Sequence, residues 1–110
     1  MAVHPASPPV AALRWRDGRL EILDQTLLPA QEHWLALHGD GDTAAAIARL
    51  AVRGAPNIGI TAAYGLAMAV AADPSDAAVD DAARVLRAAR PTAVNLAWAV
   101  DRVQAAVLAA

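Results

Sequence analysis

A change of hydrophobic period near Asp42 constrains the fold of this chain more than any other feature. Before this point apolar residues tend to alternate with polar ones, which is the period of a half-buried strand. After it they recur every three to four residues, which is the period of an amphipathic helix. Strands followed by helices are typical of an α+β domain. We therefore expect a small antiparallel sheet of about three strands followed by about four helices.

The strand half predicts a β-hairpin that turns at Asp17-Gly18. Both residue types tolerate the positive φ angles that a two-residue hairpin turn requires. The apolar residues that alternate on the two sides of the turn are Leu13, Trp15, Leu20 and Ile22. Because an isolated hairpin is only marginally stable, it needs a third strand or a helix behind it. Residues 32–37 are the candidate third strand.

The helical half contains start and stop signals for four helices. Asp42 is a favourable N-cap for the first helix, and Gly54 is expected to end it. Pro56 can open the second helix, which runs to about residue 72, because the first helical position needs no N–H. The third helix is expected over about residues 76–90. Thr92 is the expected cap of the fourth.

The third and fourth helices carry clear apolar stripes. Their members are Val79, Ala82, Ala83 and Leu86 on the third helix, and Leu96, Val100, Val103 and Val107 on the fourth. Spacings of three and four residues place each set on one helical face. We predict that these faces form the core, with Trp15, Trp34 and Trp98 as its large anchors.

The residue sizes limit how much core the chain can build alone. Apolar residues make up 57% of the sequence, but alanine accounts for more than a quarter, phenylalanine is absent and there are two methionines. Alanine favours helix but removes little area from water. The helical pattern is also unfinished at residues 103–110, without a capping glycine or a polar tail. We expect a flexible lead-in at 1–12 and, at 13–110, one domain that is a piece of a larger protein.

Charge and composition exclude several classes of function. The net charge of −2 gives no electrostatic footprint for nucleic acid or an anionic membrane. All nine basic residues are arginine, which excludes Schiff-base chemistry within the chain. Cysteine is absent, and His4, His33 and His38 lack metal-ligand spacing, so no metal site is expected. The uncharged stretch 55–72 is rich in Ala and Gly and is interpreted as a buried helix, not a membrane span.

The start of the chain shows no secretory signal. Residues 1–15 lack a basic region followed by an apolar region. A cytoplasmic location is therefore the expectation.

Residues 52–59 form the densest cluster of special residues, Val-Arg-Gly-Ala-Pro-Asn-Ile-Gly. Gly54 permits a tight turn and close approach of a ligand to the backbone. The first turn of the following helix offers free N–H groups, and Arg53 beside it would complete a pocket suited to phosphate. Alternatively, Arg53 complements the end of the preceding helix and Gly54 is its C-cap. These residues alone leave both readings open.

Arg90-Pro91-Thr92 repeats the arrangement of an arginine before a helix start. Complementing the dipole of the preceding helix is the simpler role for Arg90. Asn95 would lie one turn into the fourth helix, facing either a pocket or solvent. Asp80 and Asp81 diverge by about 100° around a helix, so they are interpreted as a solvated face and not as an acid/base pair.

Two of these segments resemble the signature of the methylthioribose-1-phosphate isomerase family. They are residues 52–65, Val-Arg-Gly-Ala-Pro-Asn-Ile-Gly-Ile-Thr-Ala-Ala-Tyr-Gly, and residues 90–99, Arg-Pro-Thr-Ala-Val-Asn-Leu-Ala-Trp-Ala. The opening, with Trp15, Asp17-Gly18, Leu23-Asp24-Gln25 and Leu28-Pro29, is also similar to the start of that family. Asn57 departs from the family, which usually carries alanine there.

The resemblance implies a sugar-phosphate isomerase, an intramolecular oxidoreductase that needs no cofactor. Its reaction converts 5-methylthioribose 1-phosphate to 5-methylthioribulose 1-phosphate in methionine salvage. The resemblance also implies that residues 13–110 are the amino-terminal domain of a larger two-domain enzyme, and that the complete protein is a homodimer. The wider group leaves alternatives open: isomerases of 5-deoxyribose 1-phosphate or ribose 1,5-bisphosphate, and non-catalytic regulatory subunits of a translation-initiation exchange factor.

The resemblance also assigns site residues. Arg53, Gly54 and Ala55 match the family's substrate-binding triplet, and Arg90 matches a further substrate-binding arginine. The family's catalytic cysteine and aspartate lie in a larger carboxyl-terminal Rossmann-like domain. Since this chain has no cysteine and no matching aspartate segment, we expect no catalytic residue in it and no turnover by it alone.

Overall fold

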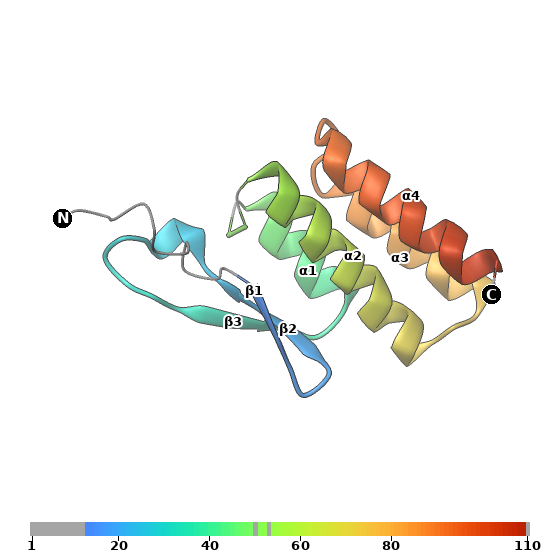
Figure 1. Cartoon of the computed structure of the whole chain (residues 1–110), viewed down its shortest axis with the longest axis horizontal. Coiled ribbons are helices and arrows are strands. Elements are labelled where there is room, and N and C mark those ends of the chain that lie inside the picture. The colour runs from blue at the N-terminus through green and yellow to red at the C-terminus, as the bar shows by residue number, and fades with distance from the viewer. Residues whose placement is uncertain (1–12, 50, 53, 110) are drawn as a thin grey trace, which may run out of the picture.

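The chain folds into a three-stranded antiparallel sheet followed by four helices, which confirms the α+β prediction (Figure 1). The computed structural model describes residues 13–49, 51–52 and 54–109, the side chains of Ala55, Leu108 and Ala109 excepted. The predicted lead-in at 1–12 lies outside the described residues. The elements are β1 (Leu13–Arg16), β2 (Arg19–Leu23), the 3₁₀ turn η1 (Gln25–Leu27), β3 (Trp34–Leu37), α1 (Asp40–Ala48), α2 (Ala55–Ala72), α3 (Asp76–Ala88) and α4 (Val94–Ala109).

The hairpin turns where the sequence predicts it. Asp17 has φ 53° and Gly18 has φ 78°, as a two-residue turn of this kind requires. Trp15 pairs with Leu20 across β1 and β2. The strand order is β1-β2-β3, so β2 lies in the middle and supplies the buried residues Leu20 and Ile22. The predicted third strand is shorter at its start than expected, because β3 begins at Trp34.

One core joins the sheet to all four helices. The sheet contributes Leu20, Ile22 and Leu37 to it, and the helices contribute most of the remainder. The predicted stripe of α3 is buried in full, and the stripe of α4 is buried at Leu96 and Val100 and partly buried at Val103 and Val107. α2 contacts the other three helices and β2, so it is the central element of the fold.

The prediction that Asp42 caps the first helix is wrong. α1 begins at Asp40, and its N-cap is Gly39, which makes no side-chain capping bond. Asp42 lies in the first turn, where its Oδ2 accepts a hydrogen bond from the His38 N–H at 3.2 Å. Thr43 Oγ1 donates to the Gly39 carbonyl at 2.7 Å. The side chains of Asp42 and Thr43 thus bond to backbone groups of the chain that enters the helix, and the N-cap lies three residues earlier than predicted.

The prediction that Gly54 ends the first helix is also wrong. α1 ends at Ala48, and Arg49 is its C-cap. Ala51 donates its N–H to the Ala46 carbonyl at 3.0 Å, which closes the helix with a backbone bond and needs no glycine. Gly54 is instead the N-cap of α2, with φ 91°. Its interpretation as a C-cap is therefore excluded.

The ends of α3 and α4 differ slightly from the predictions. α3 ends at Ala88 and not near residue 90. α4 begins at Val94, so Thr92 lies in the preceding turn and is not its cap. The Ala93 carbonyl accepts the first hydrogen bonds of α4, from Leu96 and Ala97, which moves the helix start beyond Thr92.

The tryptophans are not core anchors, contrary to the prediction. Trp15 is 48% exposed and Trp98 is 63% exposed, while Trp34 is only partly buried. Small residues fill much of the space between the helices, so the broad indole rings lie outside it. Alternation and helical spacing place these rings on faces, but spacing does not reveal whether a neighbour covers the face.

None of the helices in the described part of the chain has the length and hydropathy needed to cross a membrane.

Candidate functional site

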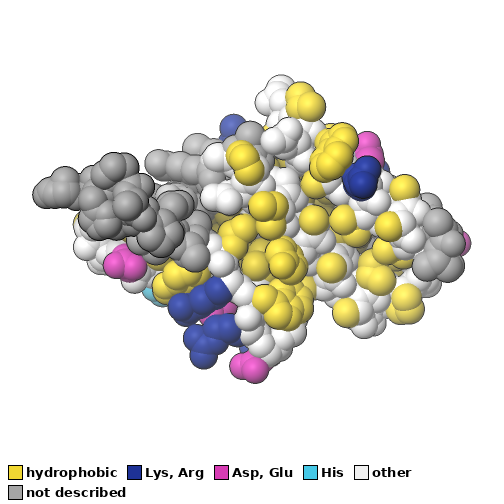
Figure 2. Space-filling model, viewed as in Figure 1, with side chains coloured by type: hydrophobic (Ala, Val, Ile, Leu, Met, Phe, Trp, Pro, Cys, Tyr) yellow, Lys and Arg dark blue, Asp and Glu magenta, His cyan; other side chains and the backbone are white. Residues whose placement is uncertain are grey.

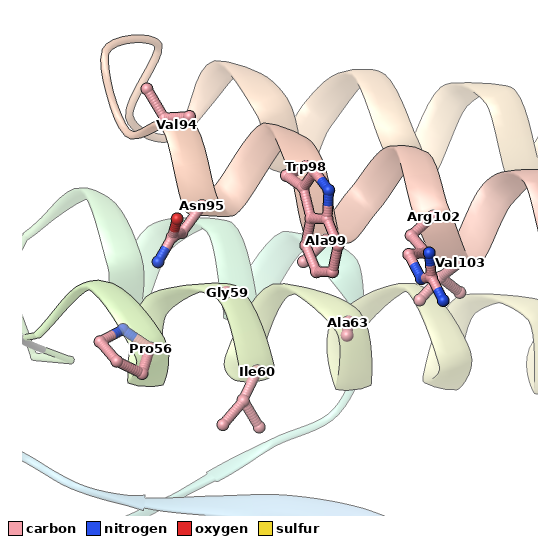
Figure 3. A pocket seen from close by; sticks show the side chains of 10 residues that line it. All are labelled: Pro56, Gly59, Ile60, Ala63, Val94, Asn95, Trp98, Ala99, Arg102 and Val103. Atoms are coloured by element: carbon pink, nitrogen blue, oxygen red, sulfur yellow. The ribbon is translucent and has the colours of Figure 1, made fainter.

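The starts of α2 and α4 lie at the same end of the molecule. The two helices run in the same direction side by side, with Pro56 of the first turn of α2 opposite Val94 and Asn95 of the first turn of α4 (Figure 3). A helix start presents free N–H groups and the positive end of the helix dipole. Two starts at one end form a region suited to an anionic group.

Gly54 fixes the geometry of the α2 start. Its φ of 91° belongs to a backbone region that other residues rarely adopt. Its carbonyl accepts the N–H of Ile58 at 2.9 Å, the first hydrogen bond of the helix. A methyl group at Gly54 would meet no atom of the described residues within 4 Å, so these residues leave the approach to this backbone open. The role predicted for Gly54 beside a ligand stays a prediction.

The structure describes only part of the predicted substrate-binding set. Arg53 lies outside the described residues, and so does the side chain of Ala55, although Ala55 is the first residue of α2. Arg90 lies in the connection that precedes α4, partly buried, and its carbonyl accepts the Ala93 N–H at 2.9 Å. Gly54 and Arg90 therefore belong to the connections at the starts of the two paired helices.

An apolar groove of about 600 Å³ begins at this end and follows the seam between α2 and α4 (Figure 3). Its lining residues are Pro56, Gly59, Ile60, Ala63, Val94, Asn95, Trp98, Ala99, Arg102 and Val103. The Trp98 ring lies along the middle of the groove, and Asn95 points from α4 toward Pro56 (Figure 3). Sequence reasoning missed this groove because it assigned Trp98 to the core.

Apolar side chains gather over the same face of the molecule (Figure 2). Val94 is 79% exposed and Ile60 is also exposed. Trp15 of β1 stacks on Tyr64 of α2 with ring centroids 5.3 Å apart, which extends the face toward the sheet. Contiguous apolar faces of this kind are typical of interaction surfaces.

Asp24 is a buried carboxylate that sequence reasoning gave no role. Only 3% of its surface is exposed, and both of its oxygens are hydrogen-bonded. Oδ1 accepts from the Thr26 N–H at 3.0 Å and from Thr26 Oγ1 at 2.6 Å. Oδ2 accepts from Arg49 Nη2 at 3.2 Å. The Asp-x-Thr spacing, typical of a local side-chain turn, was the available signal.

The surroundings of Asp24 favour its charged form. Burial is the largest single influence and raises the pKa of this carboxyl, but the hydrogen bonds from the Thr26 side chain and backbone, with the Arg49 guanidinium, together lower the pKa below its usual 3.8. Asp24 is therefore held as a carboxylate in the ion pair with Arg49.

The residues beside Asp24 also contact the connection between α1 and α2. The Gln25 N–H donates to the Ala51 carbonyl at 2.9 Å. Ala51 and Val52 are buried. Ala51 also donates its N–H to the Ala46 carbonyl at 3.0 Å, so backbone bonds to Gln25 and to α1 both hold this residue of the connection.

The described residues offer binding groups and no evident acid/base pair. Asp80 and Asp81 are exposed, as predicted; Asp81 pairs with Arg84, and Asp80 accepts from Gln104 Nε2 at 2.6 Å. His33 and His38 are exposed on either side of β3. Across the described part of the chain, no three His, Cys, Asp or Glu side chains converge as metal ligands would. The arrangement can hold an anion next to an apolar surface.

The model of the initiation factor 2 subunit family matches residues 51–110, which include both helix starts. The chain belongs to the initiation factor 2 subunit family. Among solved structures, it is similar to 5-methylthioribose 1-phosphate isomerase from Pyrococcus horikoshii, with a TM-score of 0.83 and 30% identity over 89% of this chain and 29% of that one. It is also similar to translation initiation factor eIF-2B, subunit delta, from A. fulgidus, with a TM-score of 0.74 and 32% identity over 89% of this chain and 34% of that one.

Curated relatives point to one branch of the family. The chain is 52% identical to the methylthioribose-1-phosphate isomerase of Marinobacter nauticus over 84% of its own length and 27% of the relative's. It is 51% identical to that of Alkalilimnicola ehrlichii over 94% of its length and 32% of the relative's. The resemblance stated from the motifs is thus confirmed. The chain spans about a third or less of the length of these relatives.

Proposed function

We propose that this chain is the amino-terminal domain of a longer isomerase that converts 5-methylthioribose 1-phosphate to 5-methylthioribulose 1-phosphate in methionine salvage. The observation that carries the proposal is the 52% identity to a protein named for this activity, over 84% of the chain. The fold supports it through a TM-score of 0.83 against a solved isomerase of the same name. Identity of this size over a whole domain favours a shared substrate over a shared fold alone.

In this proposal the two helix starts hold the substrate's phosphate. Arg53, Gly54 and Ala55 bind it at the start of α2, where backbone N–H groups and an arginine suit an anion. Arg90 supplies a second guanidinium from the connection before α4. The phosphate on the anomeric carbon hinders ring opening, so firm positioning of the sugar has to precede the transfer of hydrogen. The domain thus contributes binding and orientation.

The catalytic groups come from the part of the protein that these 110 residues do not contain. Relatives about three times as long leave room for a second domain. We propose that this domain is Rossmann-like and carries the catalytic cysteine and aspartate, and that it covers the apolar groove between α2 and α4. The 110-residue chain alone is then inactive. The complete protein would be a cytoplasmic homodimer that needs no metal or organic cofactor and binds no nucleic acid.

A second candidate is a non-catalytic regulatory subunit. The observation in its favour is the similarity to the eIF-2B delta subunit, at a TM-score of 0.74 and 32% identity. Isomerases of 5-deoxyribose 1-phosphate or a related sugar phosphate are a third. The higher TM-score and the curated relatives favour the methylthioribose enzyme over both.

The test is an assay of the complete protein, produced from the coding sequence that includes and continues this chain. Purified protein is incubated with 5-methylthioribose 1-phosphate, and ketose formation is followed by NMR. In parallel samples, 5-deoxyribose 1-phosphate and ribose 1,5-bisphosphate replace the substrate. Turnover of the methylthio sugar with the highest kcat/KM supports the proposal. Absence of turnover with all three would favour the regulatory subunit.

Arg90→Ala tests the site within the same assay. Loss of a guanidinium that binds phosphate weakens substrate binding, so KM is expected to rise about tenfold or more. Arg84→Ala is the matched control, because Arg84 is an exposed arginine of α3 that pairs with Asp81. Circular dichroism of both variants checks that the fold is intact. Equal KM values for the two variants would remove Arg90 from the site.

A further inference from the structure

We propose that Asp24 is a positioning residue for the start of α2. It acts by holding, with Gln25 and Arg49, the short connection that leads from α1 to Gly54. The inference rests on the proposed function, because that function places the phosphate of the substrate at the start of α2. The Leu23-Asp24-Gln25 segment, part of the motif at the start of the chain, would then serve to position the start of α2.

Asp24 and Gln25 contact the connection at two points, one through a side chain and one through the backbone. Arg49, whose Nη2 donates to Asp24 Oδ2 at 3.2 Å, is the first residue after α1. Ala51, two residues further, accepts the Gln25 N–H at 2.9 Å and donates its own N–H to Ala46 at 3.0 Å. The backbone N–H of Asp24 donates to the His33 carbonyl at 2.8 Å, which holds the chain beside Gln25 whatever the side chain at position 24. The Asp24 carboxylate therefore reaches the connection through Arg49.

Distance along the chain makes this anchoring relevant to Gly54. Ala51 and Gly54 are three residues apart, and three residues span at most about 10 Å. Glycine has more backbone freedom than any other residue, so its conformation at φ 91° has to be selected by its neighbours. A loosened connection would allow Gly54 and the free N–H groups of α2 to occupy several positions. Anion binding would then have to restore the order first, which weakens it.

A purely structural role for Asp24 makes different predictions. The Thr26 bonds to Oδ1 are local and remain within η1, whereas the Arg49 bond to Oδ2 reaches the connection. Thr26→Val removes one hydrogen bond to the same carboxylate without touching the connection. Electrostatics alone would also act in the opposite direction, because removal of the negative charge of Asp24 should strengthen the binding of an anion.

The experiment is a titration of the ¹⁵N-labelled chain with inorganic phosphate, followed through the Gly54 amide resonance. Asp24→Asn keeps the shape of the side chain and removes its charge. Its apparent affinity for phosphate is expected to fall about threefold to tenfold. Thr26→Val should lose stability and keep the wild-type affinity. Amide hydrogen exchange at Ala51 and Val52 should accelerate in Asp24→Asn and stay slow in Thr26→Val.

The titration distinguishes failure of the positioning role from failure of the phosphate site. Unchanged or tighter phosphate binding by a folded Asp24→Asn overturns the positioning role and leaves the proposed function intact. Absence of a saturable Gly54 shift in the wild-type chain contradicts the phosphate site itself, and the positioning role with it. If Asp24→Asn fails to fold, Arg49→Gln replaces it, because Arg49 is half-exposed and its substitution disturbs the core less. Arg49→Lys, which keeps the positive charge, is then the control. Equal affinities of these two Arg49 variants would overturn the inference.

Discussion

A methyl group on Gly65 would lie 2.7 Å from Thr43 Cγ2, so α2 and α1 touch through the backbone of one and the side chain of the other. Both residues are buried, and Thr43 cannot turn away freely because its Oγ1 donates to the Gly39 carbonyl at 2.7 Å. The close approach of these helices therefore requires glycine at this position for reasons of space.

Gly65→Ala is expected to destabilise the chain by about 1–3 kcal/mol, since it overpacks a contact that cannot relax. Urea denaturation followed by circular dichroism measures the loss. Gly41→Ala is the control, because Gly41 lies in α1 and an added methyl group would meet none of the described residues within 4 Å. The stability of this variant should stay equal or rise. Thr43→Ser, which removes Cγ2 and keeps the hydroxyl, should partly rescue Gly65→Ala. An unaffected Gly65→Ala variant would mean that the helices separate at little cost.

The stack of Trp15 on Tyr64 predicts energetic coupling between the sheet and α2. Aromatic pairs at such distances contribute about 0.5–1.5 kcal/mol beyond the area they bury. A double-mutant cycle of Trp15→Ala and Tyr64→Ala in urea denaturation should return a coupling energy in this range. Tyr64→Phe keeps the ring and should preserve the coupling with Trp15. Additive single substitutions would show that the two rings touch without stabilising each other.

The ion pair of Asp24 predicts a stability difference that depends on pH. The pKa of this carboxyl is lower in the folded chain than its usual 3.8, so the carboxylate stabilises the fold above that value. The contribution is lost as pH falls through the folded-state pKa, below 3.8. Asparagine does not titrate, so the stability gap between wild type and Asp24→Asn should be largest near neutral pH and shrink in this acidic range.

Urea midpoints measured from pH 7 down to pH 2 test this expectation. Asp81→Asn, a change at an exposed aspartate of α3, controls for general effects of net charge. A gap that stays constant through the acidic range would show that Asp24 contributes through its shape and not through its charge.

Much of the fold is readable from the sequence because its signals are local. Asp17-Gly18 fixes the hairpin, and the stripe from Val79 to Leu86 fixes the buried face of α3. The starts of α1 and α4 were harder to predict. Gly39 caps α1 without a side-chain hydrogen bond, and Ala93, not Thr92, accepts the first hydrogen bonds of α4. These starts depend on how the entering chain is held by other elements, which no short window of sequence contains.

The candidate site was predictable to a smaller extent. Gly54 was singled out from its place before a helix, since glycine at a helix start has a direct physical meaning. Arg90 was assigned to the site only by the family resemblance, and both roles stay predictions. Asp24 and the groove were missed because both depend on partners distant in sequence: Asp24 meets Arg49 across 25 residues, and the groove needs α2 and α4 side by side. The exposure of Trp98 depends on which elements pack beside α4 and not on its own neighbours in the chain.

Trp98 gives the last prediction, which concerns the proposed cover of the groove. In the 110-residue chain its side chain is 63% exposed, so Trp98→Ala should change the free energy of unfolding by no more than about 0.5 kcal/mol. In the complete protein the same ring would be buried against the second domain, and its removal should cost about 2 kcal/mol or more. Thermal unfolding of both forms, with Arg84→Ala as an exposed control on α3, measures the difference. A small effect in both forms would show that the groove stays open to solvent in the complete protein and is available to a different partner.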